Sequence, residues 1–162
     1  MDDLLDRLRA LTRQREYAAA IRLCDEALAS SERDDRARLW RLRAYVHQQM
    51  QNYEMAAADV STGLSEQAGE LSLIFMRASI YVELRRFVEA DADLEQLLEI
   101  ERARGEAFFR DSALLLQAIC LRHLERPSEA LAICERLPRD VRTWALGRLW
   151  TPEELERESR AD

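Results

Sequence analysis

The chain has 162 residues, which suffices for one domain or one short solenoid and is too short for two ordinary domains. Hydrophobic residues make up 48% of it and charged residues 34%, with only four Gly and three Pro, so a folded and helix-rich chain is expected. The formal net charge of −7 argues against a general binder of nucleic acid or of anionic membranes, because both require a basic surface.

Residue usage narrows the chemistry further. All 24 cationic residues are arginine, and the absence of lysine excludes a Walker A loop, a kinase-type catalytic lysine and a Schiff base. The three cysteines, Cys24, Cys120 and Cys134, are far apart in apolar segments, so we expect buried thiols in a reducing compartment. Residues 1–4 are acidic and do not resemble a signal peptide, and no apolar stretch reaches the ~20 residues that span a bilayer. A cytoplasmic protein is expected.

Apolar and aromatic residues recur at steps of three and four along the chain, which is the spacing of amphipathic helices. In chain order the stripe runs through Leu4, Leu8 and Leu11; Ala20, Leu23 and Ala27; Trp40, Ala44 and His47; Ile74, Ala78 and Tyr81; and Leu94, Leu97 and Leu98. Turn-forming residues interrupt it at 30–35, 65–69, 105, 127, 138 and 151–152. The sequence therefore predicts a string of helices joined by short turns.

A short motif recurs in this string: a turn, then an aromatic residue, then alanine three residues later. Its copies are Glu16-Tyr17-x-x-Ala20, Asn52-Tyr53-x-x-Ala56, Arg86-Phe87-x-x-Ala90 and, with proline as a weaker fit, Arg126-Pro127-x-x-Ala130. Successive alanines are 36, 34 and 40 residues apart (20 to 56, 56 to 90 and 90 to 130). These intervals are close to the 34-residue period of a helix-turn-helix repeat.

The pattern resembles the tetratricopeptide repeat (TPR) family, whose first helix carries a bulky, a small and an aromatic residue and whose second carries alanine and a large residue. The copies read Leu4, Leu8, Leu11, Ala20, Cys24; Trp40, Ala44, His47, Ala56, Val60; Ile74, Ala78, Tyr81, Ala90, Leu94; and Leu114, Ala118, Leu121, Ala130, Cys134. The first copy lacks the small residue on its first helix. Where the family usually has leucine before the small residue, this chain has Arg43, Arg77 or Gln117.

The resemblance implies an all-α fold, an α-solenoid of about four TPR-like repeats with C-terminal capping helices. The repeat domain is expected over residues 1–138, as repeats of approximately 1–34, 37–70, 71–104 and 111–138, and the capping helices over 139–162. The pattern predicts one long helix over residues 85–104 that ends at Gly105. The interval between the third and fourth copies of the motif is six residues longer than the one before it, and we place these extra residues near 101–111.

The segment after residue 138 is expected to cap the solenoid. Val141, Trp144, Ala145 and Leu149 are interpreted as a new apolar stripe. Thr151-Pro152-Glu153-Glu154 predicts a helix start with a capping box. The charged residues 153–162 are expected to screen the stripe and keep the protein soluble.

No catalytic or metal-binding constellation is present in the sequence. His47 and His123 lack a second ligand at helical spacing, so we expect His47 in the core and His123 at the surface or groove. No serine lies in a Gly-x-Ser-x-Gly elbow, and no cysteine has a neighbour that would lower its pKa. The carboxylates of Glu89, Asp91, Asp93, Glu95, Glu99 and Glu101 are interpreted as a solvated convex face. We expect no enzyme activity, no cofactor and no metal.

In the family that the chain resembles, the first helix of each pair lines a concave groove that holds partners. Carried over by position, this implies that the first helices expose Leu5 and a set of partner-binding residues. These are Arg9, Arg13, Arg38, Arg41, Tyr45, Phe75, Met76, Ser79, Leu115, Ile119 and Arg122. Arginine binds carboxylates through two hydrogen bonds, and the aromatic residues supply apolar contact. The implied partner is a protein or peptide with acidic and apolar residues.

The expected function is that of a cytoplasmic protein–protein interaction scaffold or adaptor, which binds a polypeptide segment in the groove. An alternative is a dedicated inhibitor, such as an immunity protein that neutralises a toxin, or a secretion-type chaperone that caps one cognate protein. The small size and acidic charge suit this alternative. A nucleic-acid-binding helical repeat is a third reading, which the charge disfavours, and self-association remains open.

Overall fold

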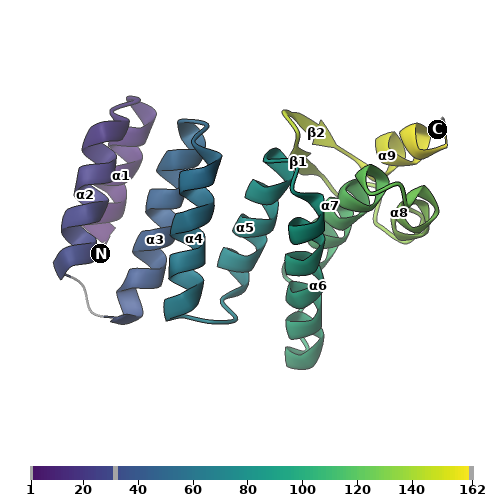
Figure 1. Cartoon of the computed structure of the whole chain (residues 1–162), viewed down its shortest axis with the longest axis horizontal. Coiled ribbons are helices and arrows are strands. Elements are labelled where there is room, and N and C mark those ends of the chain that lie inside the picture. The colour runs from purple at the N-terminus through teal and green to yellow at the C-terminus, as the bar shows by residue number, and fades with distance from the viewer. Residues whose placement is uncertain (1, 31–32, 161–162) are drawn as a thin grey trace. The chain divides into compact units, whose positions relative to one another are not determined.

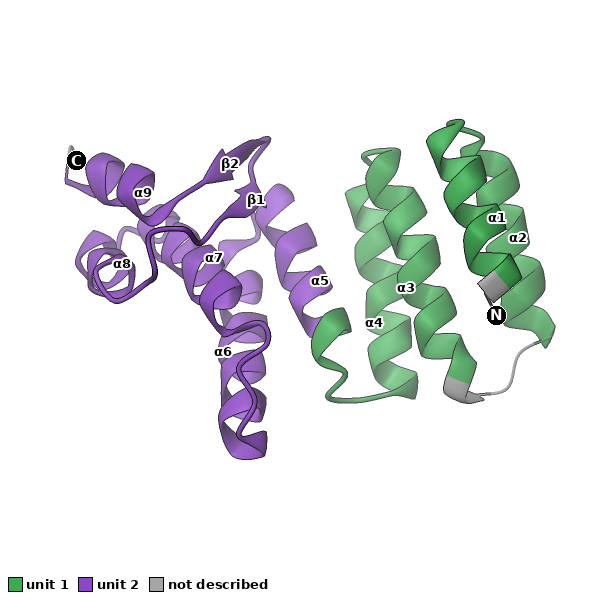
Figure 2. Cartoon of the chain, turned by 180° about the vertical axis from the view of Figure 1, so that it is seen from behind, with its two compact units in different colours: residues 1–73 green, residues 74–162 purple. Residues whose placement is uncertain are grey.

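The computed structural model describes residues 2–30 and 33–160. Within these residues the chain forms helices α1 to α9 and one two-stranded antiparallel sheet. Figure 2 colours its two compact units, residues 1–73 (unit 1) and residues 74–162 (unit 2). The expected all-α class is confirmed, and a short hairpin is the one β element of the described residues.

Unit 1 contains two antiparallel helix pairs, coloured purple to blue in Figure 1. Helices α1 (Asp2–Arg13) and α2 (Tyr17–Ser30) form the first pair. Helices α3 (Arg33–Gln49) and α4 (Tyr53–Glu66) form the second, and α5 (Leu71–Glu83) begins at the end of the unit. The interior at the first pair is built on Leu8, Ala20, Cys24 and Val46. The first three belong to the predicted first copy of the repeat, and Val46 was not predicted.

The small residues of the repeat lie inside each unit. The motif alanines and the small residues of the first helices are fully buried: Ala20, Ala44, Ala56, Ala78, Ala90, Ala118 and Ala130. At Gly63 on α4, a Cβ atom would lie 3.2 Å from both Leu73 Cδ1 and Trp40 Cβ. Small side chains at such places let neighbouring helices pack closely.

The turn inside each helix pair has the same backbone geometry. The second residue after the first helix has a positive φ of 57–60° in all four pairs, at Arg15, Gln51, Arg85 and Glu125. The N–H of the following residue then bonds to a carbonyl five positions earlier, as from Asn52 to His47 at 2.9 Å and from Arg86 to Tyr81 at 2.8 Å. This is the Schellman motif, which satisfies carbonyls at a helix end.

Unit 2 continues with α5 and then α6 (Phe87–Arg104), α7 (Arg110–His123) and α8 (Pro127–Cys134). The 18-residue helix α6 ends at Gly105, whose φ is 68° and whose N–H bonds to the carbonyls of Arg102 and Glu101. The predicted long helix and its glycine stop are therefore confirmed.

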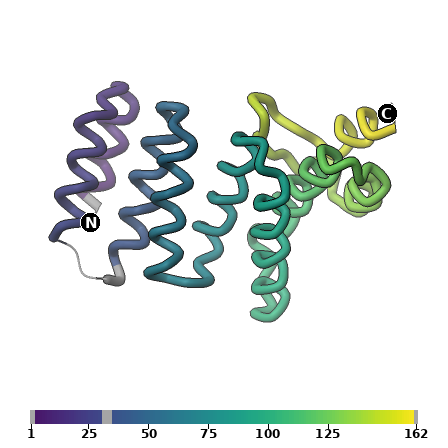
Figure 3. The backbone as a smooth tube through the Cα atoms, viewed as in Figure 1, coloured from purple at the N-terminus to yellow at the C-terminus, as the bar shows by residue number. Residues whose placement is uncertain are grey.

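A β-hairpin occupies part of the segment where capping helices were expected. Strand β1 (Thr143–Ala145) pairs antiparallel with β2 (Arg148–Trp150), with Trp144 opposite Leu149. Figure 3 shows the backbone reversing at the tip, where Leu146 and Gly147 have φ values of 54° and 75°. Two consecutive positive φ values suit a two-residue hairpin turn and exclude a helix. The helical prediction was therefore wrong for residues 143–150. The Glu83 carboxylate of α5 accepts the Leu146 N–H at 2.8 Å and so contacts the hairpin tip.

Helix α9 (Pro152–Ser159) begins as predicted. The Thr151 hydroxyl accepts the N–H of Glu154 at 3.2 Å, and the Glu154 carboxylate accepts the N–H of Thr151 at 2.9 Å. These two bonds are the capping box.

The role expected for the charged tail does not fit its packing. Leu155 of α9 is fully buried, and the helix packs against α7 and α8. Trp144 and Leu149 of the hairpin remain 64% and 49% exposed. Leu155 of α9 therefore contributes to the interior of unit 2, and Trp144 and Leu149 of the hairpin stay exposed. Residues 161–162 lie outside the described residues.

Candidate functional site

The predicted groove residues of α1 are mostly exposed. Arg9 and Arg13 lie on the surface, and Arg9 Nη1 is 3.3 Å from the Asp6 carboxylate. The Arg13 side chain bonds to the Arg9 carbonyl at 3.3 Å. Leu5, which was expected to be exposed, is 8% exposed, because it lies on the apolar side of the helix.

A hollow of about 250 Å³ lies in unit 1 at the predicted arginines of α3. We call it the α3 hollow; it is lined by Ala37, Arg38, Arg41, Gln67, Glu70, Ser72 and Leu73. Arg41 Nη1 donates to Ser72 Oγ at 3.2 Å, and the Ser72 hydroxyl donates in turn to the Glu70 carboxylate. Arg38 and Tyr45 are exposed on the same helix, Tyr45 by 47%. Sequence reasoning missed Gln67 and Glu70, because they lie in the connection after α4 and not on a first helix.

The predicted groove residues of α5 are half-buried and take part in internal contacts. The Phe75 ring stacks on Phe109, with centroids 5.2 Å apart, and Phe108 meets Phe109 edge-on at 4.8 Å. The Ser79 hydroxyl bonds to the Phe75 carbonyl at 2.9 Å, and Met76 is half-buried. Phe108 is 86% exposed, and the sequence pattern did not single it out because it lies in the extra residues between repeats.

Two predicted groove residues of α7 are buried. Leu115 and Ile119 have no exposed surface, so their expected exposure was wrong. The reason is that α7 packs against α6 and α8 and also against β1 and α9. Arg122 is mostly buried and lies 3.8 Å from the Glu158 carboxylate of α9.

The polar residues that replace the family's leucine have structural partners. Arg43 pairs with Asp59 at 3.0 and 2.7 Å, and Arg77 pairs with Asp93 at 2.8 and 2.7 Å. Both pairs join the first helix of a repeat to the second across 16 residues. Gln117 donates to the Asp91 carboxylate at 2.8 Å. These departures from the family pattern thus hold helices together.

The interpretation of the α6 carboxylates as one solvated face was partly wrong. Asp91, Asp93 and Glu101 are buried, with exposures of 8%, 6% and 2%. Asp91 and Asp93 are bound by Gln117 and Arg77, which lie far away in the sequence. Glu101 accepts the N–H of Phe109 at 2.6 Å. The remaining members of the run, Glu89, Glu95 and Glu99, are exposed.

Both histidines have internal neighbours. His47 is 7% exposed, with Nε2 3.8 Å from the Asp59 carboxylate, so its expected place in the core is confirmed. His123 is half-buried and stacks on Phe87, with centroids 4.4 Å apart. Burial lowers the pKa of His123, and the nearby charges of Arg122 and Arg85 lower it further.

The described residues hold no group of three His, Cys, Asp or Glu side chains placed to bind a metal ion. No helix in the described ranges has both the length and the apolar character to cross a bilayer.

No protein-family model matches this sequence, and no curated protein matches it. Solved structures do match. One is a Podosopora anserina protein described as kinesin light chain TPR-like repeats. It shares 16% sequence identity with this chain and has a TM-score of 0.72, over 83% of this chain and 71% of that chain. MamA from Desulfovibrio magneticus RS-1 is 11% identical, with a TM-score of 0.69 over 83% and 71%.

YrrB, described as a TPR protein with an unusual peptide-binding site, is 18% identical, with a TM-score of 0.64 over 82% of this chain and 64% of that chain. At such low identities these likenesses establish the fold. They agree with the repeat alanines, the four equivalent turns and the paired helices described above. The chain therefore has the tetratricopeptide-repeat fold.

Proposed function

We propose that this protein is an interaction scaffold that binds a polypeptide segment with acidic and apolar side chains, and that the α3 hollow is a principal contact. The observation that carries the proposal is the pair of arginines, Arg38 and Arg41, at one hollow of the surface. A guanidinium has five N–H donors, and Arg41 uses one of them on Ser72. Both arginines therefore have donors available for a ligand carboxylate.

The surroundings of the two arginines support a peptide ligand. The Glu70 carboxylate in the hollow already accepts the hydroxyl and the N–H of Ser72, so its charge is partly compensated. Tyr45 lies one turn beyond Arg41 on the same helix and is exposed. Tyrosine and arginine are among the residue types that contribute most to the binding energy of protein interfaces. Peptide binding by a protein of the same fold, YrrB, is consistent with this function.

The role that we propose is non-catalytic and cytoplasmic. Cys24, Cys120 and Cys134 are all free and buried, which suits a reducing compartment. Arg9, Arg13, Phe75, Met76, Ser79 and Arg122 are retained as secondary contacts, whereas the burial of Leu115 and Ile119 removes them from the proposed surface.

The experiment is affinity purification of the full chain from its native cell, followed by calorimetric titration of the partner found. Arg38→Glu/Arg41→Glu should weaken binding by about 2 kcal/mol or more per lost charge pair, and affinity should fall with added salt. Circular dichroism should show unchanged helicity, because neither arginine is in the core.

The matched control is Arg7→Glu/Arg22→Glu, which makes the same charge change at two exposed positions of unit 1 outside the hollow. This control should bind almost as the wild type does. Equal losses in the two variants would show that net charge alone governs binding and would refute the proposed site. One partner at fixed stoichiometry would indicate a dedicated inhibitor or chaperone, and several partners an adaptor.

A further inference from the structure

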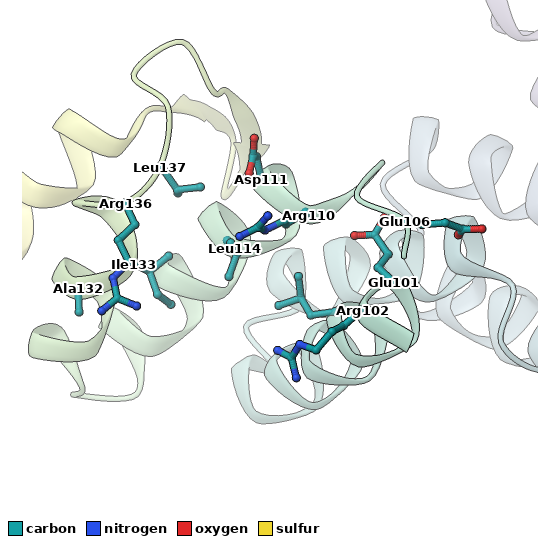
Figure 4. A pocket seen from close by; sticks show the side chains of 11 residues that line it. Glu101, Arg102, Glu106, Arg110, Asp111, Leu114, Ala132, Ile133, Arg136 and Leu137 are labelled. Carbon is teal, nitrogen blue, oxygen red and sulfur yellow. The ribbon is translucent and has the colours of Figure 1, made fainter. Parts of the chain in front are cut away.

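A second and larger hollow, of about 540 Å³, lies within unit 2. We call it the α6–α8 hollow, because residues from α6, from the start of α7 and from the α8 region line it (Figure 4). Its apolar wall includes Leu98, Leu114 and Ile133, which are half-buried. Its volume lies in the range of pockets that enclose small ligands, and a short peptide segment has that size. Glu106 and Arg110, at the extra residues between repeats, contribute to its lining.

Three arginines from three elements surround this hollow. Arg102 comes from α6, Arg110 from α7 and Arg136 from the turn after α8 (Figure 4). All three are exposed, and none forms a salt bridge with a described residue. In contrast, salt bridges hold most other arginines of unit 2: Arg77, Arg86, Arg122, Arg126, Arg139, Arg148 and Arg160. The acidic side chains of Glu106 and Asp111 also line the hollow.

Glu101 adds a buried acceptor at the hollow. It is 2% exposed, and one of its carboxylate oxygens accepts the Phe109 N–H. Its other oxygen, Oε2, has no hydrogen-bond partner among the described residues. A buried acceptor without a donor costs free energy, so a ligand that offers an N–H here would gain a charge-assisted hydrogen bond.

We infer that the α6–α8 hollow binds an acidic peptide segment, with its carboxylates on the three arginines, an apolar side chain on the leucine and isoleucine wall, and a backbone N–H at Glu101. This inference rests on the proposed scaffold function and adds a contact on a different part of the chain. A peptide supplies the anion, the apolar group and the N–H donor at close spacing. Inorganic phosphate lacks the apolar group and a fatty acid lacks the N–H, so neither matches all three features.

The probe is a heptapeptide of alternating glutamate and leucine, labelled with fluorescein at its N-terminus and amidated at its C-terminus, and the readout is fluorescence anisotropy with the full chain. Arg110→Glu/Arg136→Glu should weaken binding by at least about tenfold. The control Arg85→Glu/Arg157→Glu reverses two exposed arginines of unit 2 that lie outside the hollow, and it should change affinity by less than about twofold. Circular dichroism checks that each variant is folded.

A nuclear magnetic resonance titration locates the binding. The Phe109 amide, which bonds to Glu101, and the Ile133 methyl groups should shift on addition of the peptide. A dissociation constant of about 1 mM already corresponds to weak affinity. The absence of binding at that peptide concentration would therefore overturn the inference. Equal losses in the two arginine variants, or tighter binding of a lysine–leucine peptide or of an oligonucleotide, would also overturn it.

The two proposals can fail separately. If Arg38→Glu/Arg41→Glu abolishes binding of the probe peptide and Arg110→Glu/Arg136→Glu does not, the result supports the α3 hollow as the binding site. The inference about the α6–α8 hollow is then wrong. The reverse result supports the α6–α8 hollow, and the partner titration described above then decides the α3 hollow independently.

Discussion

At the scale of single residues, Arg43 and Arg77 occupy the position where TPR repeats usually carry leucine. Each guanidinium forms two hydrogen bonds with an aspartate on the second helix of its repeat. The aspartates are buried, with side-chain exposures of 4% for Asp59 and 8% for Asp93. Because a buried carboxylate is tolerated only when it is paired, arginine and aspartate depend on one another at this position.

The first prediction concerns the pair of Arg77 and Asp93. Asp93→Ala should lower the free energy of unfolding by about 2–3 kcal/mol, because it removes the carboxylate to which the mostly buried Arg77 guanidinium donates two hydrogen bonds. Arg77→Leu/Asp93→Ala should recover part of that loss, since leucine is the family's usual residue. Urea denaturation measures both. Arg86 and Glu89 form an exposed pair, so Glu89→Ala should lower the free energy of unfolding by about 0.5 kcal/mol or less. Equal losses of stability in Asp93→Ala and Glu89→Ala would contradict the prediction.

At the scale of elements, the hairpin and α9 change the surroundings of α7. Helix α7 is the first helix of the last pair, and without further elements one of its faces would be exposed to solvent. Here β1 and α9 both pack on α7, whose buried residues run from Ala113 to Leu121. These elements are held by long-range contacts, such as the bond of Glu83 to the hairpin tip. The C-terminal segment therefore belongs to the core of unit 2.

The second prediction tests this structural role of α9. Leu155→Ala should lower the free energy of unfolding by about 2–4 kcal/mol, because it creates a cavity at a fully buried position. Trp144→Ala removes a larger side chain that is 64% exposed, and it should change stability by about 0.5 kcal/mol or less. Thermal denaturation of both variants provides the comparison. A neutral Leu155→Ala would mean that α9 is a dispensable tail.

At the scale of the whole molecule, the reactivity of the three cysteines can be used to follow the unfolding of both units. Cys24 lies in unit 1, and Cys120 and Cys134 lie in unit 2. Burial raises the pKa of the Cys24 and Cys120 thiols to about 12 and that of Cys134 to about 11. Because the thiolate is the reactive form, the folded protein should protect all three.

The third prediction is a labelling experiment with iodoacetamide at pH 8, read by mass spectrometry. Each native thiol should react at least about 100-fold more slowly than the new thiol of Ala18→Cys, because position 18 is exposed and an ordinary thiol is partly ionised at this pH. With increasing urea, Cys120 and Cys134 should become reactive together, since α7 and α8 pack against each other in one unit. Reaction of Cys134 while Cys120 stays protected would show that unit 2 unfolds in parts.

The sequence by itself determined the features that depend on neighbours three to five residues away. The apolar stripes predicted the helices, the repeated alanines predicted the positions of close packing, and Gly105 and Thr151 predicted a helix end and a helix start. These features depend on backbone periodicity and on capping, which are local. The exposure of Arg38 and Tyr45 on α3 was predictable for the same reason.

The tertiary structure alone decided which charged and apolar groups are buried. Asp91 and Asp93 look like surface residues until Gln117 and Arg77 are seen to bind them, from 26 and 16 residues away. Leu115 and Ile119 are buried because the C-terminal elements pack on α7. The α6–α8 hollow likewise brings residues 98 and 137 to one place. Burial is set by contacts between distant segments, and a periodic pattern along one helix carries no information about what packs against it.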